Sequence, residues 1–436
     1  MLLDSALRAA RDAYVRAHPT SAALAERARA VLPGGNTRSG LHVDPFAFRV
    51  AGADGANLTD VDGNVYLDLL GNYSAGLLGH RPDAVRAAVH ATLERGWSLG
   101  AMSESEIAFA EAVAGRFASI EQVRFTNSGT EAAMMAVLTA RHATGRTRVV
   151  VFDGGYHGGL LYFGPTGAPL RAPFEYGVLP YNDLAAVERE FSEHGERIAC
   201  VLVEPMLGAG GCIPAEPAFL AALRDHTRRA GSLLIFDEVM TSRLAWGGAQ
   251  QLTGVAPDLT VLGKYLAGGL SFGAFGGRRD VMAAFDPAGG GLTHGGTFNN
   301  NAFTMAAGAA VHGAMDGAGV GGGALTPEAL DALRERGERF RAALAEVFTA
   351  SPLAFTVTGW GSLCSIHPVA GPVRAPADLR AADPRWRDLF FHELLAAGFY
   401  FAPRGYLAPS LEVTDDDLDR FVAAVSAFCT RHHDTR

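Results

Sequence analysis

Apolar and polar positions along this chain follow two different periods, one typical of helices and one of buried strands. Apolar residues recur at helical spacing in the stretches 5–31, 83–95, 104–117, 130–144, 183–195, 217–230, 326–349 and 415–431. Short apolar runs alternate with the middle stretches, namely "VRFTN", "RVVVF", "IACVLVEP", "SLLIFDE" and "LTVLGK". This alternation predicts a mainly parallel sheet with helices on both faces. Such a sheet binds ligands at the carboxyl ends of its strands.

The two ends of the chain have a different pattern from the middle. Residues 48–70 contain short strand-like runs with Asp-Gly turns, which predict a hairpin or meander. A glycine-rich joint is predicted at 313–325, and 353–368 is strand-like. We therefore predict an α/β fold with a large domain over 71–315 and a smaller α+β domain from both termini, residues 1–70 and 316–436. The helix at 5–31 is expected to pack on a neighbouring element or on a partner subunit.

Composition narrows the class of protein. The 436 residues are 48% hydrophobic and 19% charged, as in a globular protein, and the formal charge of −9 without a basic run argues against nucleic acid as a partner. The absence of a long apolar run argues against a membrane span, and the N-terminus lacks a secretory signal. Four distant cysteines have no metal-ligand spacing, so we expect reduced thiols, no metal site and a cytoplasmic location. They are Cys200, Cys212, Cys364 and Cys429.

The first chemical signal is a strand that stops at Asn127 and a helix that opens with Ser128, Gly129 and Thr130. Free backbone N–H groups and the helix dipole make an anion site there. The alternative is an ordinary Ser/Thr cap with Glu131 in the first turn, and alone the motif favours that alternative. The chain lacks the glycine patterns of nicotinamide and P-loop sites, so a dehydrogenase is disfavoured.

Two further strand ends carry an aromatic turn and an acid. Tyr156 and His157 lie in a glycine-rich turn, where the aromatic ring could stack on a flat ligand or simply be half-buried. Asp237 ends a fully apolar strand, where a carboxylate needs a cationic partner such as a protonated ring nitrogen. Its alternative is a cap for the next turn. Glu204 repeats the pattern one strand earlier.

Lys264 completes the set, because no Asp or Glu lies within five residues on either side of it. An isolated lysine at a strand end is usually a surface residue. It can also be an amine that acts as a nucleophile. Taken together, the helix start, the aromatic turn, the acid and the lysine match the phosphate, ring face, ring nitrogen and aldehyde of pyridoxal phosphate (PLP). The conjunction is more specific than any single motif.

With these motifs in place, the chain resembles the class III aminotransferases, which are fold-type I PLP enzymes. The motifs "TNSGTEA", "GYHG", "VEP", "LLIFDEV", "LGK" and "GTF" occur in that family's order, and the resemblance covers roughly residues 30–430. "PGGNTRSG", "LTDVDGN" and "GAFGGR" resemble the glutamate-1-semialdehyde aminomutase branch. "VEPMLGAGGCIP", "GKYLAGGLSFGAFGG" and "PRGYLAPSLEVTDDDLDR" are similar to bacterial β-phenylalanine (β-amino acid) aminotransferases.

The resemblance also implies roles for the cofactor residues. Lys264 would join PLP as a Schiff base and carry the proton, and Asp237 would pair with the pyridine nitrogen. Thr297 would reach the phosphate of a partner subunit, which implies a homodimer. The other residues expected to bind or surround the cofactor are Ser128, Gly129 and Thr130 at the phosphate, Tyr156 and Val239 on the two ring faces, and His157 and Glu204 nearby.

Two arginines, Arg38 and Arg404, match positions that contact substrate carboxylates in the β-amino acid branch, although each could instead form a surface salt bridge. The implied reaction is transamination of a β-amino acid, most simply an aromatic one such as β-phenylalanine. It gives a 3-oxo acid, and 2-oxoglutarate or pyruvate accepts the amino group. The alternatives are a 2,1-aminomutase, which the segment "LEVTDDDL" disfavours, an ω-aminotransferase of other amines, and a PLP-binding protein without turnover.

Overall fold

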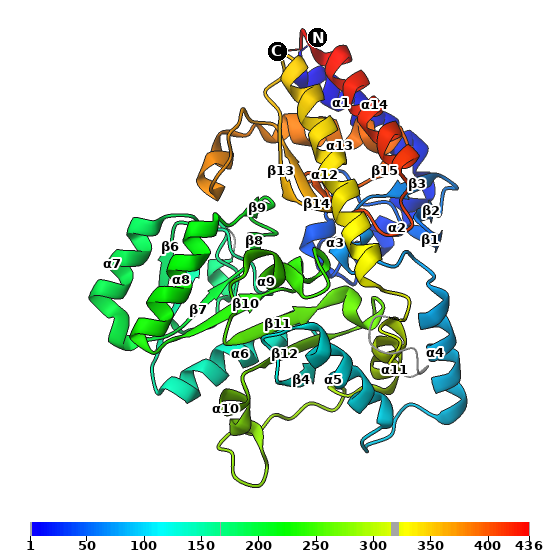
Figure 1. Cartoon of the computed structure of the whole chain (residues 1–436). Helices are drawn as coiled ribbons and strands as arrows, with labels where there is room; N and C mark the ends of the chain where they lie inside the picture. Colours follow the sequence, from blue (N-terminus) through cyan, green and yellow to red (C-terminus); the bar gives the residue numbers. More distant parts are fainter. Residues whose placement is uncertain (1, 166, 315–321, 436) are drawn as a thin grey trace. The chain divides into compact units, whose positions relative to one another are not determined.

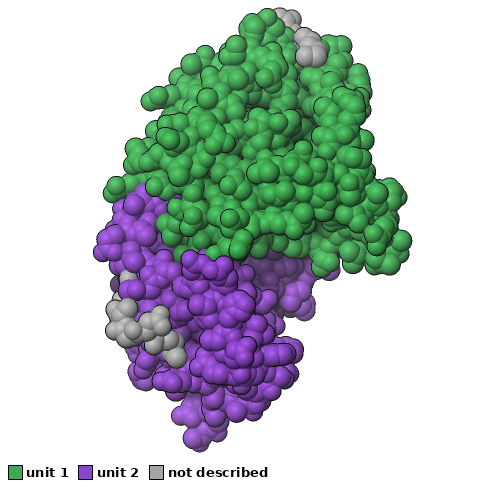
Figure 2. Space-filling view, turned by 90° about the vertical axis from the view of Figure 1, so that its right-hand side faces the viewer, with its two compact units in different colours: residues 1–81, 335–373, 377–436 green, residues 82–334, 374–376 purple. Residues whose placement is uncertain are grey.

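The computed structural model describes residues 2–165, 167–314 and 322–435. The chain forms two compact units, which Figure 2 shows in different colours. Unit 1 consists of Met1–Arg81, Glu335–Val373 and Ala377–Arg436, and unit 2 of Pro82–Arg334 and Arg374–Pro376. Unit 1 thus draws on both termini, as predicted for the smaller part. The domain boundaries at 70/71 and 315/316 stay a prediction, and residues 315–321 of the expected glycine-rich joint lie outside the described residues.

Unit 2 is built on a seven-stranded sheet with the order β4-β12-β11-β10-β7-β5-β6 (Figure 1). Strand β12 is antiparallel to both of its neighbours, and the other pairs are parallel. The mainly parallel sheet predicted from the sequence is therefore confirmed. The strands are β4 (Gln122–Thr126), β5 (Arg148–Phe152), β6 (Glu175–Leu179), β7 (Ile198–Val203), β10 (Leu233–Asp237), β11 (Leu259–Gly263) and β12 (Gly273–Gly277), with a small separate pair β8 (Met206–Leu207) and β9 (Ile213–Pro214).

In several of these strands, every second side chain packs against a helix on one face of the sheet. Val149 and Val151 of β5, and Cys200 and Leu202 of β7, face the same buried cluster as the alanines of α6, since successive strand residues point to opposite faces. The five helices predicted between 83 and 230 are confirmed. The helices of unit 2 are α4 (Asp83–Arg95), α5 (Glu104–Arg116), α6 (Gly129–Thr144), α7 (Leu184–His194), α8 (Pro217–Ala230), α9 (Gly248–Thr253), α10 (Arg279–Met282) and α11 (Ala302–Val311).

Unit 1 begins with two helices, α1 (Leu3–Ala17) and α2 (Pro19–Arg29), where the sequence predicted a single helix over 5–31. Proline lacks the N–H that would continue a helix, so Pro19 starts a new one instead. The apolar side of α1 packs inside unit 1, where Leu3, Leu7 and Tyr14 belong to its core. The meander expected over 48–70 is confirmed as three antiparallel strands, and β15 (Phe399–Tyr400) pairs with the third of them in parallel.

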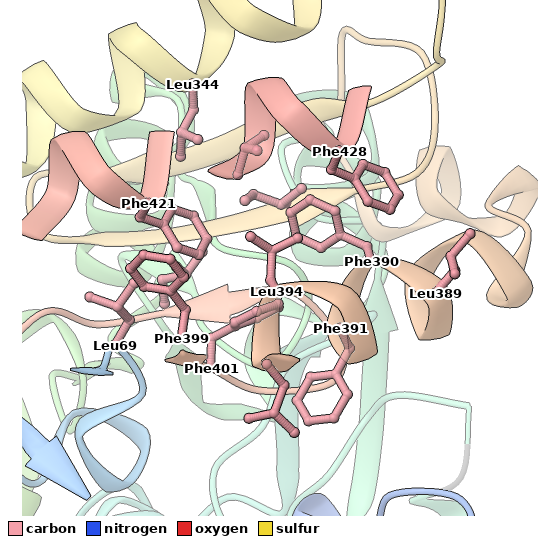
Figure 3. Close-up of a cluster of buried hydrophobic side chains, with 14 of the residues drawn as sticks. Leu69, Leu344, Leu389, Phe390, Phe391, Leu394, Phe399, Phe401, Phe421 and Phe428 are labelled. Carbon is pink, nitrogen blue, oxygen red and sulfur yellow. The ribbon is translucent and has the colours of Figure 1, made fainter. Parts of the chain in front are cut away.

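A phenylalanine-rich core holds unit 1 together (Figure 3). Phe421 of the last helix is fully buried, and its ring lies 5.2 Å from that of Phe399 and 5.9 Å from that of Phe401. The elements around this core are β1 (Val50–Asp54), β2 (Asn57–Asp60), β3 (Val65–Asp68), α3 (Gly71–Ser74), α12 (Pro327–Ala350, in unit 1 from Glu335 onward), β13 (Thr356–Trp360), β14 (Leu363–His367), α13 (Pro384–Ala396), β15 (Phe399–Tyr400), β16 (Tyr406–Leu407) and α14 (Asp415–His432).

All four cysteines are buried, and none of them forms a disulfide bond. Burial disfavours the charged thiolate, so it raises the pKa of Cys200 and of Cys364 to about 12. Among the described residues, no helix has the length and apolar character needed to cross a membrane.

Candidate active site

The residues predicted to form the site follow strands whose carboxyl ends share one edge of the sheet in unit 2. Strands β4 and β11 both run antiparallel to β12, so they are parallel to each other. Ser128 follows β4, Lys264 follows β11, and Asp237 ends β10. The turn with Tyr156 and His157 comes after β5. The sheet therefore brings four strand ends, predicted separately from the sequence, to a single edge.

A buried pair formed by Asp237 and His157 lies at the centre of this edge. The Asp237 Oδ2 atom is 2.7 Å from His157 Nδ1, and both side chains are almost fully buried. The second carboxylate oxygen, Oδ1, accepts a hydrogen bond of 3.0 Å from the backbone N–H of Val239. These two contacts fix the orientation of the carboxylate. The sequence indicated that Asp237 needs a partner but did not identify His157, because the two residues come from strands separated by β7.

Glu204, which directly follows β7, accepts a hydrogen bond from the turn that contains Tyr156. Its Oε1 atom accepts a hydrogen bond of 2.9 Å from the backbone N–H of Tyr156, and Oε2 accepts one of 2.8 Å from Gly208. Burial raises the pKa of Glu204 from 4.5 to about 7; the charge of Asp237 adds to this rise and that of His157 opposes it. Glu204 therefore holds a proton close to neutral pH while it anchors the turn.

The start of α6 shows the capping arrangement, which is one of the two interpretations that the sequence left open. The Ser128 hydroxyl accepts a hydrogen bond of 3.2 Å from the N–H of Glu131, and the Glu131 carboxylate accepts one of 2.6 Å from the N–H of Asn127. The capping interpretation is thus confirmed. The glycine turn lies against this helix start, because a Cβ atom on Gly158 would come within 2.2 Å of Thr130 Oγ1.

Lys264 occupies a strained backbone position between β11 and the short 3-10 helix Lys264–Ala267. Its φ is +59°, in the left-handed region that non-glycine residues rarely adopt. Val239 lies next to it, since a Cβ atom on Gly263 would come within 3.3 Å of Val239 Cγ1. The same valine also packs at the α6 start, where a Cβ atom on Gly129 would be 3.1 Å from Val239 Cγ2. Val239 thus links the lysine segment to the helix start.

Tyr156 and Thr297 are the more exposed of the predicted residues in unit 2. The Tyr156 side chain is 45% exposed, and its ring meets that of Tyr162 edge-on at 5.3 Å between centroids. Thr297 is exposed in a loop beside Phe298, which is 63% exposed. The described residues contain no group of three or more His, Cys, Asp or Glu side chains arranged to bind a metal ion.

Arg38 and Arg404 belong to unit 1, where both guanidinium groups lie over one aromatic ring. Their Cζ atoms are 5.6 Å and 4.9 Å from the centroid of the Tyr73 ring. Arg38 also donates a hydrogen bond of 2.7 Å to the amide oxygen of Asn72. Both arginines are exposed, and within the described ranges neither forms an ion pair with a carboxylate.

Tyr73 itself is held in an unusual backbone segment. Asn72, Tyr73 and Ser74 all have positive φ angles, of 49°, 55° and 71°. Its hydroxyl donates a hydrogen bond to the carbonyl of Gly40, and its ring stacks on Tyr406 at 5.9 Å. Three consecutive left-handed residues without a glycine are costly, and such strain is typical of functional segments. No motif in the sequence marks Tyr73 as a candidate site residue.

Comparison with known proteins assigns the family. The family model "Aminotransferase class-III" matches residues 39–428. The β-phenylalanine transaminase of Variovorax paradoxus is 48% identical to this chain, and the alignment covers 99% of this chain and 97% of that protein. The crystal structure of a β-phenylalanine aminotransferase from the same organism superposes on this structure with a TM-score of 0.94. That superposition covers 99% of this chain and 98% of the other.

More distant relatives carry other names. A glutamate-1-semialdehyde 2,1-aminomutase of Sorangium cellulosum is 39% identical over 93% of this chain and 95% of that protein. An ω-transaminase from Sphaerobacter thermophilus has 38% sequence identity to this chain, and its crystal structure superposes with a TM-score of 0.85. That superposition covers 94% of this chain and 97% of the other. The chain therefore belongs to the class-III aminotransferases and has the fold-type I architecture that its sequence predicted.

Proposed function

We propose that this chain is a PLP-dependent transaminase of β-amino acids. Its amino donor is an aromatic β-amino acid such as β-phenylalanine, its acceptor is 2-oxoglutarate or pyruvate, and its product is a 3-oxo acid. The observation that carries the substrate class is the pair of guanidinium groups, Arg38 and Arg404, over the Tyr73 ring. The full-length similarity to the β-phenylalanine transaminase of Variovorax paradoxus supports the same choice.

The chemistry of the strand-end residues fits the cofactor. A buried carboxylate oriented by His157 suits a protonated pyridine nitrogen, and the N-terminus of α6 suits a phosphate. Tyr156 and Val239 offer apolar surface for the two faces of a ring, and Lys264 offers an amine. When bound, PLP supplies an electron sink that stabilises negative charge on the substrate carbon that loses its proton.

We assign the following tasks to the protein's own groups. Lys264 would hold the cofactor covalently through its Nζ atom, and once the substrate amine has displaced that atom, the released amine would take the proton from C3 of the β-amino acid. Asp237 would keep the ring nitrogen of a bound cofactor protonated, and His157 holds Asp237 in place through the 2.7 Å contact. Glu204 fixes the backbone at Tyr156. The residues at the phosphate are Ser128, Gly129 and Thr130.

The two arginines could bind substrate carboxylates at different distances from the reacting carbon. The reacting carbon of a 3-amino acid is one bond farther from the carboxylate than that of a 2-amino acid, yet one enzyme must accept both the donor and the 2-oxo acid. A guanidinium binds a carboxylate through two parallel hydrogen bonds, which are roughly twice as strong as neutral ones. We assign Arg38 and Arg404 to these carboxylates, with the Tyr73 ring holding the two guanidinium groups near each other.

The active unit in this proposal is a homodimer in the cytoplasm. Large apolar side chains are exposed on unit 2 in the segment between α4 and α5, in the first turn of α5 and beside Thr297, and exposed apolar patches mark interaction surfaces. They are Trp97, Leu99, Met102, Ile107 and Phe298. In this assignment Thr297 reaches the phosphate bound by the partner subunit. The buried reduced cysteines are consistent with a reducing compartment.

The test uses purified protein loaded with PLP. Bound cofactor should absorb visible light, and β-phenylalanine should bleach that band without an acceptor and give turnover only with 2-oxoglutarate or pyruvate. Turnover of glutamate-1-semialdehyde without any acceptor would instead favour the aminomutase, for which relatives of 37–39% identity are named.

The arginines are tested in the same assay. Arg38→Ala and Arg404→Ala should each retain the visible band and lose catalytic efficiency. Arg81→Ala is the matched control, because Arg81 is an arginine of the same unit whose contact is an exposed pair with Asp54 at 3.4 Å. Unchanged kinetics in both Arg38→Ala and Arg404→Ala would refute the proposed carboxylate sites.

A further inference from the structure

Arg116, the last residue of α5, is a buried cation outside the residues assigned so far. Its exposed fraction is 3%, and no carboxylate within the described part of unit 2 forms an ion pair with it. Buried arginines are normally paired with an acid, because an uncompensated charge in the interior is costly. The charge and the N–H donors of Arg116 must therefore be stabilised by groups other than a carboxylate.

Neutral acceptors surround the guanidinium instead. Its Nη2 atom donates hydrogen bonds of 2.7 Å to the Tyr265 hydroxyl and 2.8 Å to the carbonyl oxygen of Ser242. Its Nε atom donates to the carbonyl of Trp246, and Nη1 lies 3.3 Å from His312 Nε2. One planar group thus contacts three other segments of unit 2 in a fixed geometry.

Aromatic rings and a neutral histidine complete this environment. The Arg116 Cζ atom is 4.7 Å from the centroid of the Trp246 ring and 4.9 Å from that of Phe117, so cation–π attraction replaces part of the missing countercharge. Burial, reinforced by the Arg116 charge, lowers the pKa of His312 to about 3. His312 is therefore neutral. Its Nδ1–H donates to the Gly308 carbonyl at 2.8 Å, which leaves the Nε2 lone pair for Arg116.

The segments that Arg116 joins are those that present Lys264 and Asp237. Tyr265 directly follows Lys264, and its fully buried hydroxyl is one partner of the guanidinium. Ser242 and Trp246 belong to the chain that follows Asp237. Glu238 fixes that same chain independently, because its buried carboxylate accepts hydrogen bonds from the Thr241 hydroxyl and the N–H of Ala249, 2.7 Å and 2.8 Å long.

We propose that Arg116 is a positioning residue for the transamination reaction. It fixes the segment carrying Lys264 relative to the segment carrying Asp237 through the Tyr265 hydroxyl and the carbonyls of Ser242 and Trp246. The inference rests on the proposed function, which makes Lys264 the group that moves the substrate proton. Lysine cannot replace Arg116, since an ammonium group is a single point and cannot reach acceptors spread around a planar fork.

The experiment compares three variants in the PLP-loaded enzyme. Tyr265→Phe removes one hydroxyl, and Arg116→Lys keeps the charge but loses the fork. Arg224→Lys is the matched control, because Arg224 is also buried and pairs with Asp258 at 2.9 Å, at the amino end of β11, the opposite end of that strand from Lys264. The assay is single turnover of β-phenylalanine with hydrogen or deuterium at C3, normalised to bound cofactor, together with the PLP dissociation constant and the melting temperature of the apo-protein.

We expect Arg116→Lys to slow the single turnover by about 10²-fold, the cost of a displacement of roughly 1 Å, and Tyr265→Phe by about 10-fold. Both should raise the deuterium isotope effect without changing the half-saturating substrate concentration, because proton transfer becomes slower while binding does not change. The double variant should be no slower than Arg116→Lys by more than about 2-fold, since both changes remove one interaction. Arg224→Lys should lower the apo-protein melting temperature and leave the rate and the isotope effect unchanged.

Rates per bound cofactor within about 2-fold of wild type in both Arg116→Lys and Tyr265→Phe would overturn the inference, and so would an equal loss in Arg224→Lys. If Arg116→Lys does not fold, Tyr265→Phe decides, because removal of one hydroxyl leaves the packing of the ring intact. A wild-type protein that binds PLP but does not convert β-phenylalanine refutes the proposed function itself. An active wild type with unaffected variants refutes the role of Arg116 alone.

Discussion

Glu204→Gln should make the stability of the apo-protein less sensitive to pH. Glu204 is buried and accepts hydrogen bonds from the N–H groups of Tyr156 and Gly208. Its pKa rises from 4.5 to about 7 because burial disfavours the charged form. The unfolded chain therefore loses this proton near pH 4.5, whereas the folded chain keeps it until about pH 7. Between these values the folded state binds more protons, so its stability falls as the pH rises.

The size of the effect follows from this difference in pKa. Each pKa unit corresponds to about 1.4 kcal/mol, so ionising Glu204 in the folded state costs about 3 kcal/mol in total. About 2 to 3 kcal/mol of this cost is incurred between pH 5 and pH 8. Glutamine has the same shape and stays neutral, so the variant does not incur this cost. It instead places an NH₂ group near one N–H donor, a loss of about 1–3 kcal/mol that does not depend on pH.

The assay is the melting temperature of the apo-protein from pH 5 to pH 8. The difference between Glu204→Gln and wild type should shift in favour of the variant by roughly 2–5 °C across this range. Leu207→Ala is the matched control, because Leu207 is a buried neighbour in β8 without an ionisable group, and its loss of stability should be equal at both ends of the range. Parallel curves for wild type and Glu204→Gln would refute the reasoning.

Three further predictions concern separate parts of the chain. Asp237→Asn should slow the β-phenylalanine half-reaction at least about 10²-fold, measured by stopped-flow absorbance, while PLP still binds through Lys264 and the α6 start. Phe421→Ala should lower the free energy of unfolding by about 3–5 kcal/mol in urea titration, whereas Val31→Ala, at an exposed site of the same unit, should change it by less than about 0.5 kcal/mol. Thr414→Ala removes the capping box of α14 with Asp417 and should cost about 1 kcal/mol, seen as earlier loss of helical circular dichroism; an unchanged midpoint would contradict it.

The elements predicted well are those whose pattern is local. The strands β5, β7 and β10 are continuous apolar runs, and the amphipathic helices between them have clear periods. Helix α11 was missed because it is apolar on almost every side, so no helical period stands out. Strand β12 was missed because it is glycine-rich. The structure explains those glycines: a Cβ atom on Gly273 would come within 2.1 Å of the Ser128 carbonyl oxygen.

In the candidate site, too, the sequence identified residues with a local signal and missed contacts that depend on the fold. A polar residue at the end of an apolar strand is visible in the sequence, and this signal identified Asp237 and Lys264. The sequence does not show which residues they contact. His157 lies about 80 positions from Asp237, and Arg116 lies about 150 positions from Tyr265, the neighbour of Lys264, so these contacts form only when the chain folds. Tyr73 was missed for another reason, since its position depends on three left-handed residues without the glycines that normally signal them.

The burial of every thiol has a practical consequence for handling this protein. Maleimides and iodoacetamide react with exposed thiolates, and Cys200 and Cys364 offer neither exposure nor ionisation at working pH. Oxidants in air should likewise leave the folded chain without mixed disulfides. A cysteine introduced on the surface would therefore act as a single attachment point for a fluorophore or a solid support, with no need to remove the native four first.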